Sequence, residues 1–118
     1  MRLIAVLLLL FLASPAVAEQ ACPKYREGCV PLDTFKCDTI TRSKTINRLC
    51  YEPTKQYLII WLGKNNVPYH YCDIPQSVID ELKAAPSMGH YYNSGIRSKP
   101  NGEHGPYDCR DHPVPKFD

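Results

Sequence analysis

Six cysteines in a short chain are the feature that most constrains how this protein can fold. An even number of cysteines in a short exported chain is typical of a disulfide framework, which here would contain three bridges. A zinc site is the alternative, but the sequence contains no Cys-x-x-Cys pair, and an oxidising compartment favours cystine. Disulfides are therefore expected to supply a large share of the stability. The six residues are Cys22, Cys29, Cys37, Cys50, Cys72 and Cys109.

Export is predicted from the N-terminal segment. An uninterrupted apolar run from Leu3 to Ala13 follows Arg2, and residues 16–18 supply the small-x-small pattern that signal peptidase cleaves. We predict that residues 1–18 are a signal peptide and that the mature protein is secreted or periplasmic. Pro15 interrupts the run before it reaches the roughly 20 residues that a membrane-spanning helix needs. No second apolar run follows, so no membrane span is expected.

The charge of the chain argues against a general affinity for polyphosphates. The formal net charge is +2 with neutral histidines, and removal of Arg2 with the signal peptide lowers it by one unit. A chain so close to neutrality exerts little long-range attraction on a polyanion, so binding to nucleic acid would require a local basic patch.

Composition divides the mature chain into three zones. Residues 19–42 carry three cysteines, two prolines and little periodicity, and residues 98–118 are rich in proline and glycine. Both are predicted to be irregular arms that are held by disulfides. Residues 43–97 contain the periodic patterns and are expected to form the single folded domain.

Three strands are predicted in the middle zone. The segments Ser43–Tyr51, Gln56–Leu62 and Val67–Cys72 are rich in β-branched and aromatic residues. Turn-forming residues separate them at 53–55 and 63–66. The simplest arrangement is a three-stranded antiparallel meander.

Two helices are expected after the strands. Asp73 offers a cap and Pro75 suits a first turn, and Pro86 ends the helical pattern. Ser87 is positioned to cap a second, shorter helix over 88–93. The order β-β-β-α-α, with the helices on one face of the sheet, is an α+β fold. The apolar side chains that share one side of the first helix are Val78, Ile79, Leu82 and Ala85.

Both faces of the predicted sheet are apolar. Alternation places Leu58, Ile60 and Leu62 on one side, where the helices and the tyrosines of the third strand would cover them. The other side then holds Tyr57, Ile59 and Trp61, where a half-exposed sheet should carry polar residues. Either the arms fold across this second face, or it is a docking surface.

The cysteine positions favour coverage by the arms. By alternation, Cys50 and Cys72 lie on the Trp61 side, on the two outer strands of a three-stranded sheet. Two strand spacings would separate them by roughly 9.6 Å, beyond the limit of about 7 Å between bridged Cα atoms. We therefore expect each of them to pair with a cysteine of an arm and not with the other.

Three motifs stand at fixed offsets in the middle zone. They are the pair Tyr69 and Tyr71, the Asp-x-Pro segment 73–75, and the Ser-x-Gly-x-Tyr-Tyr-Asn-x-x-Ile-Arg segment 87–97. With these motifs the segment from Ser43 to Arg97 resembles the KTSC domain family, a short domain found at the C-terminus of some lysyl-tRNA synthetases and as a free-standing bacterial protein. The resemblance excludes both arms. It implies no established activity, although RNA binding has been suggested for the family.

The same segments contain the candidate binding residues. An arginine can grip a carboxylate or phosphate with two hydrogen bonds, and glycine permits close backbone approach. A structural interpretation is the alternative: the serine caps a helix, the glycine allows tight packing, the asparagine closes a turn and the arginine pairs with an acid. For the tyrosine pair we favour packing over base stacking. The candidates are Tyr69, Tyr71, Ser87, Gly89, Tyr91, Asn93 and Arg97.

Catalysis and metal binding are not expected. Ser87, His90 and Asp80 are residue types of a nucleophile triad, but no Gly-x-Ser-x-Gly elbow occurs. We expect a non-enzymatic binding module without cofactor or metal, whose partner is an unidentified protein or small molecule. RNA binding and a small secreted hydrolase are the alternatives. His70, His104 and His112 are the other possible general bases. A group of four residues could meet a metal, but solvated loop side chains are the favoured interpretation. The four are His104, Asp108, Asp111 and His112.

Overall fold

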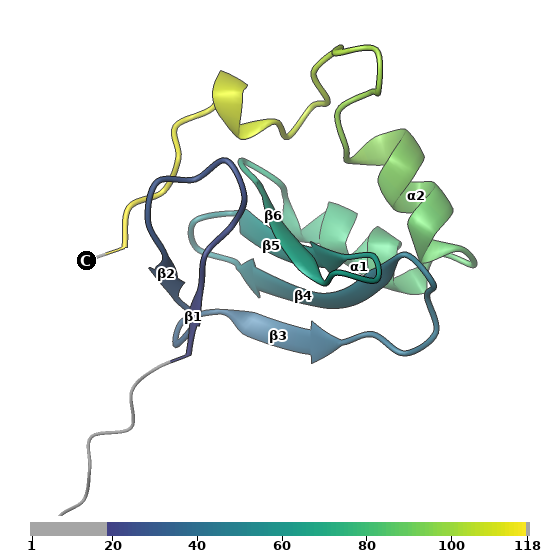
Figure 1. Cartoon of the computed structure of the whole chain (residues 1–118), viewed down its shortest axis with the longest axis horizontal. Helices are drawn as coiled ribbons and strands as arrows, with labels where there is room; N and C mark the ends of the chain where they lie inside the picture. The colour runs from purple at the N-terminus through teal and green to yellow at the C-terminus, as the bar shows by residue number, and fades with distance from the viewer. Residues whose placement is uncertain (1–18, 118) are drawn as a thin grey trace, which may run out of the picture.

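The central sheet has four antiparallel strands in the computed structural model, which describes residues 19–117 (Figure 1). The predicted signal peptide lies outside the described residues. The expected α+β fold with an antiparallel sheet and two helices is confirmed, but the three-stranded meander is wrong. The strand order is β3-β4-β5-β6, with β3 at Lys36–Thr39, β4 at Ile46–Glu52, β5 at Tyr57–Leu62 and β6 at Val67–Tyr71.

Strand β3 was not expected because its own sequence carries no strand signal. It is a short edge strand that contains the charged residues Lys36 and Asp38, and it pairs only with β4. Charged side chains are common on edge strands, where they discourage pairing with other molecules. Such a strand has no alternating apolar pattern, so only its partner reveals it.

The N-terminal arm is also more regular than expected. Strands β1 (Gln20–Ala21) and β2 (Val30–Pro31) form a small two-stranded antiparallel sheet. The disulfide between Cys22 and Cys29 closes the loop that joins them. Residues 19–117 therefore contain six strands in two sheets.

Two helices cover one face of the central sheet. Helix α1 spans Gln76–Ala84 and helix α2 spans Met88–Gly95, and a 3-10 helix, η1, follows at Cys109–Asp111. The Ser87 hydroxyl caps α2 by accepting the His90 N–H at 3.2 Å, as predicted. Asp73 does not cap α1: the N-cap residue is Pro75, which makes no side-chain cap.

The core beneath the helices is built as the alternation predicted. Buried side chains of β4 and β5 meet those of α1 and α2, and Leu58 and Ile60 are fully buried. The register explains this arrangement, because Leu49 of β4 lies opposite Ile60 and Tyr51 lies opposite Leu58. Cross-strand neighbours on one face contact each other and form a continuous apolar layer.

The arms cover the opposite face of the sheet. Phe35 of the N-terminal arm and Phe117 of the C-terminal arm pack with Tyr57, and the buried cluster extends to Ile59 and Trp61. Figure 1 shows the C-terminal segment passing from the end of α2 toward the N-terminal arm. The expectation that the arms cover this apolar face is confirmed.

The disulfides fasten both arms to the sheet. Cys50 is bonded to Cys37, which lies directly opposite it on β3, and Cys72 is bonded to Cys109 at the start of η1. The predicted pairing of each sheet cysteine with an arm cysteine is therefore confirmed. In the described part of the chain, no helix is long and apolar enough to cross a membrane.

Candidate functional site

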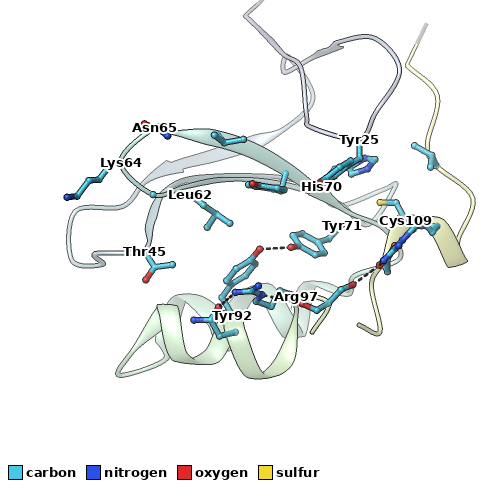
Figure 2. A pocket seen from close by; sticks show the side chains of 18 residues that line it. Tyr25, Thr45, Leu62, Lys64, Asn65, His70, Tyr71, Tyr92, Arg97 and Cys109 are labelled. Atoms are coloured by element: carbon cyan, nitrogen blue, oxygen red, sulfur yellow. Dashed lines mark hydrogen bonds and ion pairs between the residues drawn. The ribbon is translucent and has the colours of Figure 1, made fainter. Parts of the chain in front are cut away.

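A cleft of about 950 Å³ lies along strand β6 (Figure 2). Its walls come from β6, from the 63–65 turn, from α2 and from the segment that follows α2, and the N-terminal arm contributes Tyr25. Both arms contribute lining residues, Tyr25 from the N-terminal arm and Asp108 to Arg110 from the C-terminal arm, so docking of the arms completes the cleft.

Four of the seven candidate residues line this cleft. They are Tyr69, Tyr71, Asn93 and Arg97. Tyr91 is placed elsewhere, where its hydroxyl donates a hydrogen bond to a carboxylate oxygen of Glu81 at 2.6 Å. This hydrogen bond raises the pKa of Tyr91 to about 12.

Ser87 and Gly89 line a smaller hollow beside the loop that precedes β4. A Cβ atom on Gly89 would lie only 2.7 Å from the Thr45 hydroxyl oxygen, so glycine lets α2 approach this loop closely. With Ser87 acting as a helix cap, both residues have a structural explanation, which agrees with the alternative interpretation of this segment.

Tyr71 and Tyr92 meet at the base of the cleft. Their hydroxyl oxygens are 2.5 Å apart, and their rings are edge-to-face with centroids 5.8 Å apart (Figure 2). Burial raises the pKa of both tyrosines, and for Tyr71 the neighbouring Tyr92 adds to the effect. Both hydroxyls therefore stay protonated at neutral pH and act as neutral hydrogen-bonding groups.

Arg97 is a cation without a carboxylate partner among residues 19–117. One terminal nitrogen donates to the Asn93 side-chain oxygen at 3.1 Å, and Nε donates to the Ser98 carbonyl oxygen at 3.2 Å. The structural interpretation of Arg97, an ion pair with a nearby acid, does not hold within this part of the chain. The guanidinium is half-buried beside the cleft and retains donors for an anion.

The charges of Asp108 and Arg110, which also line the cleft, offset each other. Arg110 donates to both carboxylate oxygens of Asp108, at 3.0 and 2.6 Å. This interaction holds the pKa of Asp108 well below its usual range. The Ser98 hydroxyl donates to the same carboxylate at 2.6 Å. Unlike Arg110, the cleft cations Arg97 and Lys64 make no ion pair with a side chain of residues 19–117.

Gly105 holds the C-terminal arm against Arg97. Its N–H donates to the Ser98 hydroxyl at 3.0 Å, and a Cβ atom at this position would lie 2.8 Å from the carbonyl oxygens of Ile96 and Arg97. Backbone atoms cannot move away as a flexible side chain can.

We therefore expect Gly105→Ala to lower the free energy of unfolding by about 1–3 kcal/mol, the usual range for overpacking. Urea unfolding measures this loss. Gly102→Ala is the comparison variant. Its added Cβ would meet no neighbour, but its φ of +89° disfavours alanine, so a loss of stability there reports backbone strain and not a close contact. If Gly105→Ala leaves both the stability and the Arg97 amide resonance unchanged, the close contact is absent in solution.

Tyr25 is a cleft residue that sequence reasoning missed. It lies on the loop closed by Cys22 and Cys29, and the neighbouring Lys24 N–H donates to the Pro68 carbonyl oxygen at 2.9 Å. This contact docks the loop on the edge of β6. The sequence of the arm does not indicate that this loop contacts β6. The short spacing between Cys22 and Cys29 predicts only that a disulfide between them would close a small loop. Tyr92 was also missed as a site residue, despite lying next to Tyr91 in the family pattern.

His70 belongs to a network that joins both arms to the sheet. The Tyr57 hydroxyl lies 2.8 Å from His70 Nδ1, and Arg26 donates to that hydroxyl at 3.1 Å and to the Pro115 carbonyl oxygen at 2.8 Å. With Arg26 donating, the Tyr57 hydroxyl donates to a neutral His70. Burial, followed by the charge of Arg26, lowers the pKa of His70.

This network predicts a loss of stability in mild acid. Below about pH 6.5 His70 is protonated in the unfolded chain but stays neutral in the folded protein until a lower pH is reached. Unfolding therefore takes up protons, and the free energy of unfolding decreases as the pH is lowered. His70→Asn keeps an acceptor near the Nδ1 position but does not titrate. Urea unfolding between pH 8 and 5 should show wild type losing stability relative to this variant. Parallel curves for the two proteins would contradict the prediction.

The C-terminal arm holds a cluster with metal-ligand character. The ligand atoms of His104, Asp108 and Asp111 lie within 4.8 Å of one another. These ligand atoms already have polar partners within the protein. His104 Nδ1 lies 2.9 Å from an Asp111 carboxylate oxygen, and Asp108 forms an ion pair with Arg110. His112 is not part of the cluster, since its Nε2 lies 2.8 Å from the Pro106 carbonyl oxygen. The grouping of four suggested by the sequence is therefore reduced to three.

Comparison with known proteins agrees with the resemblance seen in the sequence. The model of the KTSC domain family matches residues 42–99. The crystal structure of a KTSC domain protein from Yersinia pestis is similar to this chain, with 22% sequence identity and a TM-score of 0.50. The similar region covers 55% of this chain and 89% of that protein, and at this identity it concerns the fold alone. A search of curated proteins found no match.

Proposed function

Residues 42–99 of this chain belong to the KTSC domain family, and from that premise we propose that the protein is an exported, non-enzymatic binding module. Its binding site is the cleft along β6, and its ligand carries an anionic group that Arg97 receives. Three disulfides support export, because such bonds persist in oxidising compartments outside the cytosol.

The observation that carries this proposal is the half-buried Arg97 guanidinium, which has no carboxylate partner among residues 19–117. The side chain is partly exposed, so its charge is accessible from the cleft and is not neutralised by a carboxylate of the fold. Asn93 fixes the direction of the guanidinium without neutralising its charge. A carboxylate or phosphate of a ligand would complete the set of hydrogen bonds with charge-assisted contacts.

The tyrosines support a binding role over a chemical one. Tyr71 and Tyr92 have raised pKa values and bond to each other, so they are poor proton donors and nucleophiles at neutral pH. Their rings add apolar surface to a cleft whose lining also contains charged and amide side chains, so the cleft can hold a ligand with both apolar and polar groups.

Small anionic fragments test this proposal. Titrating the isotope-labelled, oxidised protein with benzoate should shift the amide resonances of Asn93 and Arg97, whereas neutral benzamide should not. Arg97→Ala should weaken benzoate binding by about tenfold or more, as expected for loss of hydrogen bonds to a charged group. Arg42→Ala is the matched control, because it removes the same charge from an exposed position outside the cleft. Equal binding by both variants would refute the site.

Binding to single-stranded nucleic acid is a second candidate. The ring of Tyr25 lies 6.4 Å from that of Tyr69, with the Lys24 ammonium 5.2 and 5.8 Å from the two ring centres. Aromatic rings beside cations bind unpaired bases in many proteins. This candidate predicts oligonucleotide binding that weakens steeply with added salt. The near-neutral charge of the chain makes it the less favoured of the two.

A further inference from the structure

Tyr25 is held at the mouth of the cleft although it buries little surface. Its side chain is 81% exposed, and its backbone has a φ of +71°, a left-handed conformation that disfavours a residue with a side chain. The Cys22–Cys29 bridge closes the loop around it. Packing does not explain a large exposed ring in such a backbone, whereas exposed aromatic residues held rigidly are typical of contact sites.

Tyr25 and Tyr69 together form an angled pair of rings. Their planes are tilted by 45°, and both residues line the cleft that contains Arg97. Tilted rings offer no parallel faces between which a flat base could be inserted. A saccharide ring is puckered and presents C–H groups on its faces, so it can contact both rings through their apolar surfaces.

The charges of the cleft match a ligand with isolated carboxylates. Arg97 and Lys64 in the cleft, and Lys24 beside the two rings, make no ion pair with a side chain of residues 19–117, whereas Arg110 is matched by Asp108. Asn93, beside Arg97, adds an amide that can bond to hydroxyl groups. Lys64 and Arg97 lie apart in Figure 2, so carboxylates spaced along successive sugar rings match these cations better than the closely spaced charges of a polyphosphate. A carboxylate at Arg97 can accept two hydrogen bonds from the guanidinium.

We propose that the cleft along β6 binds an acidic saccharide of the uronic acid type, with a sugar ring against Tyr25 and Tyr69 and a carboxylate at Arg97. This inference rests on the proposed function and names its ligand class. It also assigns a role to the disulfide-closed loop of the N-terminal arm, which lies outside the part of the chain that matches the family.

Titration with trigalacturonate tests the inference, with binding followed by calorimetry and by amide resonances of the oxidised protein. We expect the uncharged trisaccharide maltotriose to bind at least about tenfold more weakly, because it lacks the carboxylate. Tyr25→Ala should weaken trigalacturonate binding by about tenfold, and Tyr25→Phe should retain it, because the ring and not the hydroxyl makes the contact. Both substitutions affect an exposed side chain, so folding should be unaffected.

Each contrary result has a distinct meaning. If benzoate binds in an Arg97-dependent manner but trigalacturonate does not bind, or binds equally well to Tyr25→Ala, the saccharide inference is wrong and the proposed function stands. If uridine monophosphate or a short oligonucleotide binds more tightly than trigalacturonate, the ligand class is wrong. If benzoate binding is insensitive to Arg97→Ala, the proposed function itself fails.

Discussion

Replacing Cys72 and Cys109 together by alanine is expected to lower the free energy of unfolding by about 4 kcal/mol. The bridge between them spans 37 residues, and a longer closed loop restricts the unfolded chain more strongly. It joins the end of β6 to η1, and the Cys72 N–H also donates to the Tyr107 carbonyl oxygen at 2.9 Å. Without the bridge, the C-terminal arm loses its covalent attachment to the sheet.

The matched control is the double substitution of Cys22 and Cys29, whose bridge spans only 7 residues. The same relation between loop length and entropy gives about 2 kcal/mol for this smaller loop. Urea unfolding of both variants under oxidising conditions measures the two losses. The C-terminal double variant should also weaken benzoate binding, because the segment that holds Arg97 would no longer be anchored. Equal losses of stability in the two variants would contradict the loop-length explanation.

Tyr57→Ala is expected to cost about 3–5 kcal/mol of stability, the usual cost of truncating a buried aromatic residue. Tyr57 is fully buried on the inner strand β5, and its ring packs with Phe35 from the N-terminal arm and Phe117 from the C-terminal arm. A cavity at this position would remove the contacts by which both arms cover the sheet.

Tyr57→Phe separates the contribution of the hydroxyl from that of the ring. It leaves the packing intact but deprives Arg26 and His70 of their shared partner, so we expect a loss of about 1–3 kcal/mol. Arg26 already has a buried Nε without a hydrogen-bond partner among the described residues, which makes further loss costly. Tyr25→Ala serves as the exposed control and should change stability by less than about 0.5 kcal/mol. A Tyr57→Ala protein as stable as this control would mean that the arms are not docked in solution.

Much of the fold followed from local patterns. Alternation along β5 placed Leu58 and Ile60 under the helices, and the geometry of strands excluded a bond between Cys50 and Cys72. Ser87 could be recognised as a helix cap because caps depend on a few neighbouring residues. Such features are local in the chain, or follow from the fixed spacing of strands.

The candidate site was predictable only in part. The family pattern pointed to Tyr69, Tyr71, Asn93 and Arg97, which do line one cleft. It could not separate them from Ser87 and Gly89, because that distinction depends on the packing of α2 against the loop before β4. A family sequence pattern contains residues with structural roles as well as residues with binding roles. The three-dimensional structure separates the two, because only some of these residues line the same cleft.

By itself, the sequence determined the class of the fold, the face of the sheet that each side chain of β5 occupies, and the fastening of the arms by disulfides. Only the tertiary structure decided that Lys36–Thr39 pairs with β4, that Tyr25 stands beside Tyr69, and that Arg97 is left without an acidic partner in residues 19–117. The physical reason is the range of the interactions. Hydrophobic alternation and capping act between near neighbours, whereas the docking of an arm depends on surfaces that do not exist until the sheet has formed.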